Sequence, residues 1–161
     1  MTQTYAILKS LITCGFAAGL EGLCAGTKVK SYFAELKWPP YAPPLWVWSI
    51  IGVLYYITFF FVLYRLFRHP LSNPVWTATV ILVMVMMLIN ALWNYVFFRA
   101  RKLSLSLAAT GFAPLLDVAL LICLSQLDKA AAWSLVPYLV YRIYSLWWSY
   151  SLWKMNRQIT H

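Results

Sequence analysis

Long apolar segments separated by short polar ones dominate the pattern of the chain. About 20 apolar residues span the hydrocarbon core of a bilayer as a helix, and five segments reach that length, at 6–26, 45–67, 75–98, 103–125 and 130–153. The connections between them are short except the first, 27–44. The pattern predicts an all-α integral membrane protein: one domain over 1–161, built as a bundle of five transmembrane helices with a long first loop rich in proline and tryptophan.

The composition agrees with a membrane protein and argues against a nucleic-acid-binding one. Hydrophobic residues make up 63% of the chain and charged residues 11%, whereas soluble domains carry about a quarter charged residues. The formal net charge is +9, but the basic residues sit in short clusters between the apolar segments. Clusters of this kind flank membrane helices, so we expect no nucleic-acid partner.

The distribution of these basic residues predicts an orientation. With five spans, one side of the membrane carries Lys28, Lys30, Lys37, Arg99, Arg101, Lys102, Lys154 and Arg157. The other side carries only Lys9, Arg65, Arg68 and Lys129. The positive-inside rule therefore places the first loop and the C-terminus in the cytoplasm. A bacterial inner membrane and a eukaryotic organelle membrane both fit.

Polar residues of the last segment share one face of a helical wheel; they are Ser134, Tyr138, Tyr141, Arg142, Ser145 and Ser149. Polar groups that face lipid are costly, so this face is expected to turn toward protein or a cavity. Two interpretations remain open: hydrogen bonds between helices, or a face that lines a ligand site.

Arg142 is the most informative single residue, because it lies near the middle of a span, where an unpaired cation costs several kcal/mol. We expect an intramembrane ion pair with Asp117 of the preceding segment, and Glu21 is a second candidate partner. The functional alternative is that Arg142 binds an anionic ligand group such as a propionate.

Other segments also carry faces of interest. The third has Met86, Met87, Asn90, Trp93, Asn94 and Phe97 on one side, the fourth has Ser106, Thr110, Pro114 and Asp117, and the second has Ser49, Gly52 and Tyr56. Gly15, Gly19, Gly22 and Gly26 form a stripe that favours close packing within the chain or in a homodimer. Cys14, Cys24 and Cys123 lie in apolar segments without metal-ligand spacing, so we predict no metal site and no catalytic residue.

The first loop runs into the stretch ELKWPPYAPPLWVW, residues 35–48, which contains four prolines and three tryptophans. Prolines fix φ and favour extended geometry, so such a loop loses less entropy when it becomes ordered. Its aromatic residues suit either a membrane interface or a face for an aromatic ligand.

Three stretches together resemble the TspO/MBR family, which includes the translocator protein and bacterial tryptophan-rich sensory proteins. They are YFAELKWPPYAPPLW (32–46), NALWNYVFFRARKL (90–103) and AAAWSLVPYLVYRIYSLWWSYSLWKMN (130–156). The resemblance implies a five-helix bundle whose first loop covers the cytoplasmic mouth of a pocket for flat hydrophobic ligands. Family ligands include porphyrins, haem and sterols.

The resemblance also implies site residues. Positions that match the family's binding pattern are Pro43, Pro44, Trp46, Asn90, Trp93, Pro137, Tyr138 and Leu139. With the faces described above, the full set of expected ligand-binding residues is Trp38, Tyr41, Pro43, Pro44, Trp46, Trp48, Tyr56, Asn90, Trp93, Asn94, Tyr138, Tyr141, Arg142 and Ser145. A sterol-type motif at Leu146, Tyr150 and Lys154 is expected to face lipid.

The function implied is a membrane receptor, chaperone or transport modulator for a porphyrin, haem, sterol or isoprenoid, linked to stress or tetrapyrrole regulation. No cofactor is required; the expected partners are this ligand, membrane lipids, a second copy of the chain and other membrane proteins. A structural or regulatory subunit is one alternative. A porphyrin-degrading enzyme is another, and it is disfavoured because Ile51-Gly52 and Tyr141 replace family tryptophans tied to that activity. Other departures are Trp38-Pro39, Ala109 and Ser149.

Overall fold

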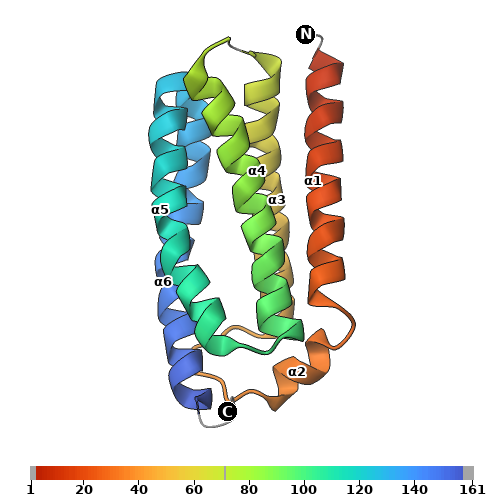
Figure 1. The fold of residues 1–161 in the computed structure, drawn as a ribbon, viewed down its shortest axis with the longest axis vertical. Helices are drawn as coiled ribbons and strands as arrows, with labels where there is room; N and C mark the ends of the chain where they lie inside the picture. Colours follow the sequence, from red (N-terminus) through yellow and green to blue (C-terminus); the bar gives the residue numbers. More distant parts are fainter. Residues whose placement is uncertain (1–2, 71, 158–161) are drawn as a thin grey trace.

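The regular structure of the described residues is helical throughout. The computed structural model describes residues 3–70 and 72–157. Its elements are α1 (Gln3–Ala25), α2 (Val29–Glu35), α3 (Leu45–Arg68), α4 (Pro74–Asn94), the π-helical turn η1 (Tyr95–Arg99), α5 (Leu103–Leu127) and α6 (Lys129–Asn156). The five long helices run along a common axis and lie at the predicted positions (Figure 1). The prediction missed α2, which forms inside the first loop.

Local signals explain where several helices begin. The Asn73 side chain accepts a hydrogen bond from the backbone N–H of Trp76 at 2.7 Å, and Pro74 follows at the first helical position of α4. Asp128 caps α6 in the same way, accepting from the N–H of Ala131 at 3.0 Å. Both side chains satisfy N–H groups that have no partner inside the helix. The short turns therefore fix where neighbouring helices reverse direction.

Four helical stretches in the described part of the chain are long and apolar enough to cross a membrane, namely α1, α3, α4 with η1, and α5. The chain is therefore an integral membrane protein. The last helix, α6, is less apolar, but its 28 residues rise about 42 Å at 1.5 Å per residue, more than a bilayer core needs. Figure 1 shows α6 lying along α5.

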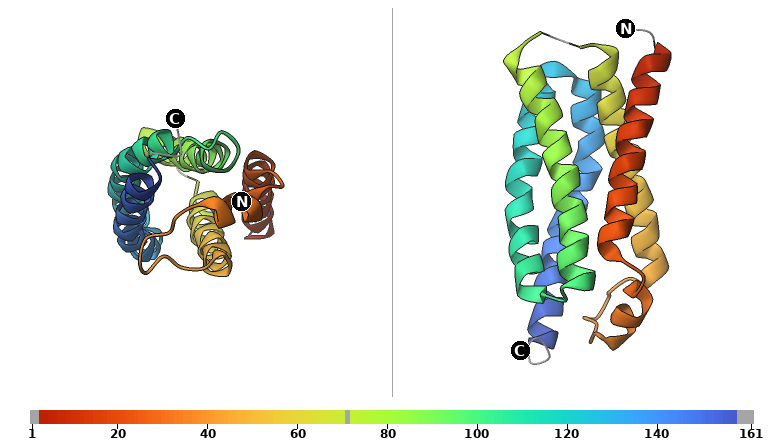
Figure 2. Two further views of the ribbon diagram at one scale, coloured as in Figure 1. Left: turned by 90° about the horizontal axis from the view of Figure 1, so that it is seen from below. Right: turned by 45° about the vertical axis from the view of Figure 1, so that its right-hand side comes forward.

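Four of the long helices surround a central space, and α1 packs outside the ring they form. Seen from the end in Figure 2, α3, α4, α5 and α6 enclose the centre, while α1 lies against α3 and α4. The N-terminus and the C-terminus lie at opposite ends of the bundle (Figure 1). The first loop crosses the end at which the C-terminus lies (Figure 2).

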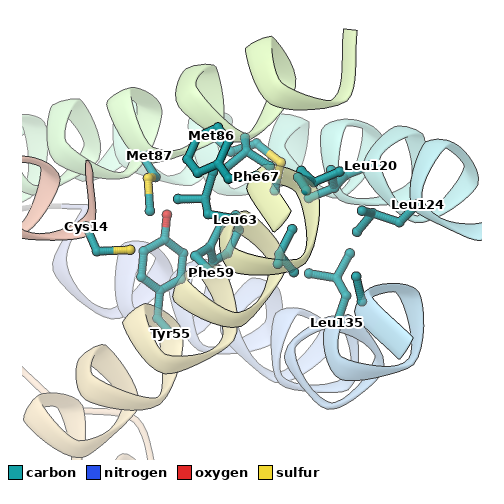
Figure 3. Close-up of a cluster of buried hydrophobic side chains, with 14 of the residues drawn as sticks. Cys14, Tyr55, Phe59, Leu63, Phe67, Met86, Met87, Leu120, Leu124 and Leu135 are labelled. Carbon is teal, nitrogen blue, oxygen red and sulfur yellow. The ribbon is translucent and has the colours of Figure 1, made fainter. Parts of the chain in front are cut away.

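Two clusters of buried side chains pack the interior of the bundle, one toward each end. The larger one is apolar and joins α3, α4, α5 and α6 through residues such as Phe59, Leu63, Leu120 and Leu135 (Figure 3). The smaller one lies at the loop-covered end; its buried members are Tyr32, Leu36, Phe97, Leu103, Trp148 and Leu152. Side chains between these clusters meet a cavity instead of a packed core.

The glycine stripe of α1 does not serve close packing within the chain. A Cβ atom placed on Gly15, Gly19 or Gly22 would meet nothing within 4 Å, so that part of the prediction is wrong. Gly26 differs, because its φ of +73° lies in the left-handed region that favours glycine. It ends α1, and a Cβ there would lie 3.4 Å from Cδ of Arg99.

Candidate functional site

A cavity of about 170 Å³ lies inside the ring of helices. The lining residues come from every long helix and from α2; aromatic and aliphatic ones include Phe33, Leu45, Trp48, Ile51, Tyr55, Met86, Ile89, Trp93, Phe97, Phe98, Leu116, Tyr138, Tyr141 and Trp148. The polar and charged ones are Glu21, Asn90, Asn94, Thr110, Asp117, Arg142 and Ser145. A mostly apolar wall with a few polar groups is typical of small-molecule sites.

Stacked rings fix the wall near the loop-covered end. Trp93 and Phe97 stack with ring centroids 4.8 Å apart and an interplanar angle of 9°. The Trp93 indole is held in place because Nε1 donates to the Ser106 carbonyl at 3.2 Å and to Thr110 Oγ1 at 3.0 Å. Trp48 lies against Trp148, with ring centroids 4.5 Å apart. A flat ligand would therefore meet a preformed aromatic surface.

An ion pair crosses the cavity wall between α5 and α6. Nε of Arg142 donates to Oδ2 of Asp117 at 2.8 Å, as expected for that pair. The Asp117 side chain is only 1% exposed. The guanidinium also lies 5.7 Å from the ring centroid of Tyr138. A paired cation and carboxylate avoid the cost that either would carry alone in an apolar environment.

Three lining residues keep a buried polar atom without a hydrogen-bond partner among the described residues: Asp117 Oδ1, Trp148 Nε1 and the Tyr55 hydroxyl. The Tyr55 hydroxyl points toward Met87 and Cys14 (Figure 3). Buried polar groups are usually paired, so these three unpaired atoms are exceptions, and with less than 1 Å² of accessible surface each they lie behind the cavity surface.

Glu21 of α1 organises a second polar group. Its Oε2 accepts from the Tyr56 hydroxyl at 2.6 Å and from Nδ2 of Asn90 at 2.9 Å. Its Oε1 accepts from Nδ2 of Asn94 at 3.0 Å. The alternative in which Glu21 pairs with Arg142 is therefore wrong, because three donors from α3 and α4 occupy this carboxylate.

Eight of the fourteen expected ligand-binding residues line the cavity: Trp48, Asn90, Trp93, Asn94, Tyr138, Tyr141, Arg142 and Ser145. The other six lie elsewhere, namely Trp38, Tyr41, Pro43, Pro44, Trp46 and Tyr56. Tyr41 and Trp46 are 92% and 65% exposed, and Trp38 stacks on Phe33 behind the lining. The loop residues fall outside because extended prolines carry the chain over the end of the bundle instead of into it.

Five more predicted positions lie outside the cavity. Pro137 and Leu139 are not among its lining residues. The residues of the sterol-type motif, Leu146, Tyr150 and Lys154, are all exposed on α6. That placement matches the expected outward direction of the motif.

Several lining residues were not predicted, among them Phe33, Tyr55 and Trp148. Phe33 and Trp148 lie in the stretches that resemble the family. The resemblance therefore drew attention to these segments, but it did not indicate whether either side chain faces the cavity. Tyr55 adjoins Tyr56 in an all-apolar part of α3, where a helical wheel gives little contrast between faces.

The cavity offers stacking and hydrogen-bonding groups for a small molecule. Among the described residues, no three His, Cys, Asp or Glu side chains come together. The arrangement combines flat aromatic walls, one ion pair and one hydrogen-bonded carboxylate.

Comparison with known proteins identifies the family. The sequence model described as the TspO/MBR family matches residues 10–154. Among curated proteins the comparison finds no match. With a match over nearly the whole chain and a bundle of five long helices around a cavity, the chain belongs to the TspO/MBR family.

Proposed function

We propose that the whole chain is one membrane-embedded domain that binds planar hydrophobic ligands such as a porphyrin, haem, a sterol or an isoprenoid. It acts as a receptor, chaperone or transport modulator in stress or tetrapyrrole regulation. The observation that carries this proposal is the cavity whose walls are stacked rings, with a few polar groups between them. Such walls suit flat apolar molecules and orient them through a small number of hydrogen bonds.

The size of the cavity limits what fits while the first loop is closed. An engineered cavity of about 150 Å³ holds benzene, so one of about 170 Å³ suits a molecule of one or two fused rings. A porphyrin or a sterol is larger. Those ligands either extend out through the open side of the cavity or need the first loop or the aromatic side chains beneath it to move outward.

Orientation and partners extend the proposal. The loop-covered end carries most of the basic residues, so we place it and the C-terminus in the cytoplasm. A bacterial inner membrane and a eukaryotic organelle membrane both satisfy this rule. No cofactor is needed for binding alone. The exposed glycine face of α1 leaves room for a second copy or another membrane protein to approach closely.

The test is a titration of the detergent-purified protein with protoporphyrin IX and with haem, followed by tryptophan fluorescence. Saturable quenching at micromolar ligand supports the proposal, and a linear response without saturation contradicts it. Two variants locate the site: Trp93→Phe removes an indole that lines the cavity, whereas Trp133→Phe removes one that is 73% exposed. Binding in the cavity predicts reduced quenching amplitude for the first variant only.

A further inference from the structure

We propose that a group of cations at the loop-covered end of the bundle binds the phosphate headgroup of an anionic phospholipid. This basic cluster consists of Lys28, Arg99, Arg101 and Lys102, all of them exposed. They come from the turn between α1 and α2, from the end of η1 and from the turn that leads into α5. None of them lines the cavity, so the proposal does not depend on which ligand the cavity binds.

Arg99 lies where the apolar spans end. Its Nη1 donates to the carbonyl oxygen of Leu23 in the last turn of α1 at 3.4 Å, and its guanidinium carbon lies 5.7 Å from the ring centroid of Tyr95. Leu23 and Tyr95 belong to spanning helices and are 74% and 46% exposed, so both face lipid. Tyrosine rings are common at the level of the headgroups. Arg99 is therefore held at that level, and within the described residues four of its five N–H groups remain free for a ligand.

Arg101 joins the two turns of the cluster. Its Nη1 pairs with Oε2 of Glu35 at 2.8 Å, and its guanidinium carbon lies 4.8 Å from the ring centroid of Tyr32. Lys28 precedes Tyr32 by one turn of helix, so it lies on the same face of α2. The φ of Arg101 is +54°, a left-handed conformation that is uncommon for arginine and that persists where surrounding contacts hold it. Contacts within the chain thus bring the cations of both turns to one surface.

The cluster keeps a surplus of positive charge. The chain has four acidic residues, of which Glu21 and Asp117 line the cavity and Asp128 caps α6 at the other end of the bundle. Only Glu35 offsets the four cations, so three positive charges remain. In the described part of the chain, neither lysine of the cluster has a side-chain partner. Binding of an anion therefore requires no existing contact to break.

The position of the cluster favours a lipid phosphate over other anions. The helix α1 and the span formed by α4 and η1 end beside the cluster, and α5 begins there, so the cations lie at the depth of the headgroups. The proposed orientation turns this end toward the cytoplasm, and the cytoplasmic leaflet carries anionic lipids. Each Lys or Arg near such a surface contributes roughly fivefold in affinity.

Two lipids with the same acyl chains isolate the effect of headgroup charge. Native mass spectrometry of the full chain in one detergent measures the first bound molecule of dioleoylphosphatidylglycerol, which is anionic, and of dioleoylphosphatidylcholine, which is zwitterionic. We expect the anionic lipid to bind at least about tenfold more tightly, as two or more such cations imply. The preference should shrink as ammonium acetate rises from about 0.05 M to about 0.5 M, because salt screens exposed charges.

Two double variants locate the site. Lys28→Gln with Lys102→Gln removes two cations of the cluster that hold no other side chain, so the preference for the anionic lipid should fall below about threefold. Arg68→Gln with Lys129→Gln is the matched control, because it removes two exposed cations at the other end of the bundle. The control should keep the preference of the unmodified chain.

Equal binding of the two lipids, or the same loss of preference in both double variants, overturns the proposal. sn-Glycerol 3-phosphate presents the phosphate without acyl chains, and we expect it not to displace the anionic lipid at equal concentration. Displacement would assign the cluster to soluble phosphates, and tighter binding of polyglutamate than of the lipid would assign it to an acidic protein; either result also overturns the proposal. If a double variant does not fold, the comparison of the two lipids on the unmodified chain still decides.

Discussion

Asn156, the last residue of α6, holds the backbone of Lys37 in the first loop through both of its side-chain groups. Its Oδ1 accepts from the Lys37 N–H at 2.9 Å, and its Nδ2 donates to the Lys37 carbonyl at 2.9 Å. Asn156 is fully buried. The loop that crosses the end of the bundle is therefore fastened to the helix that carries Arg142 and Tyr138.

The first prediction concerns this contact. Asn156→Ala removes both hydrogen bonds, and at about 1 kcal/mol each the closed position of the loop should lose about 2 kcal/mol, or roughly 30-fold in population. Amide hydrogen exchange of residues 36–44 should become faster, and release of bound protoporphyrin should quicken. Asn156→Asp keeps an acceptor for the Lys37 N–H but turns a carboxylate oxygen toward the carbonyls of Lys37 and Leu152 at a fully buried position, so it should destabilise the closed loop at least as much as Asn156→Ala. Unchanged exchange in Asn156→Ala would show that the loop is held elsewhere.

The second prediction concerns Glu21, whose carboxylate joins α1 to α3 and α4. In Glu21→Gln one oxygen becomes an N–H₂ group that faces donors such as Asn94 Nδ2, so a hydrogen bond to a charged group is lost. We expect a loss of at least about 2 kcal/mol in the free energy of unfolding, or roughly 5 °C in melting temperature.

Glu35→Gln is the matched control for that experiment. Glu35 pairs with Arg101 at 2.8 Å, but both side chains are about half exposed, and exposed pairs contribute at most about 1 kcal/mol. Its melting temperature should therefore stay within about 2 °C of the unmodified chain. A larger loss in Glu35→Gln than in Glu21→Gln would contradict this ranking of the two carboxylates.

The helices were predictable because membrane spans have a simple physical signature, a long run without charges. Arg142 and Asp117 were predictable as a pair for a related reason, since isolated charges in lipid must find each other. The partners of Glu21 could not be predicted in this way. Whether its carboxylate meets Arg142, Tyr56 or the asparagines depends on how α1 is rotated about its axis relative to α3, α4, α5 and α6. One-dimensional periodicity does not contain that rotation.

The first loop was the harder part to predict. Its prolines indicate an extended chain, but they do not indicate that α2 forms before them or that Tyr41 and Trp46 end up exposed. Those positions depend on distant contacts, such as the one between Lys37 and Asn156, which are 119 residues apart. Phe33 enters the cavity lining for the same reason.

The third prediction concerns pH and Asp128. Burial alone raises the pKa of this carboxyl, but hydrogen bonds from Arg65 and from the N–H of Ala131 outweigh it, so the pKa lies below its usual value. The resulting stability is fully present above the unfolded pKa of about 4 and is lost as pH falls through the folded pKa. The melting temperature of the unmodified chain should exceed that of Asp128→Asn by about 3 °C at pH 7.

This difference should shrink below about pH 4 and not grow. Asp128→Ala also loses the cap of α6, worth about 1 kcal/mol, so it should remain less stable than Asp128→Asn across the whole range. Thermal unfolding in one detergent from pH 7 to pH 3 measures all three proteins. A difference that widens on acidification would reverse the assigned direction of the pKa.

The last prediction fills the cavity. Gly52 of α3 lines it, and a Cβ there would meet nothing within 4 Å. Gly52→Phe should therefore fold, occupy much of the cavity and reduce binding of protoporphyrin at least tenfold, a loss of about 1.4 kcal/mol. Gly111→Phe is the matched control, because Gly111 is also a helical glycine with open space around it but is exposed and outside the lining. Both substitutions gain helix propensity, so neither should lower the melting temperature. Equal loss of binding in both variants would mean that the ligand site lies outside this cavity.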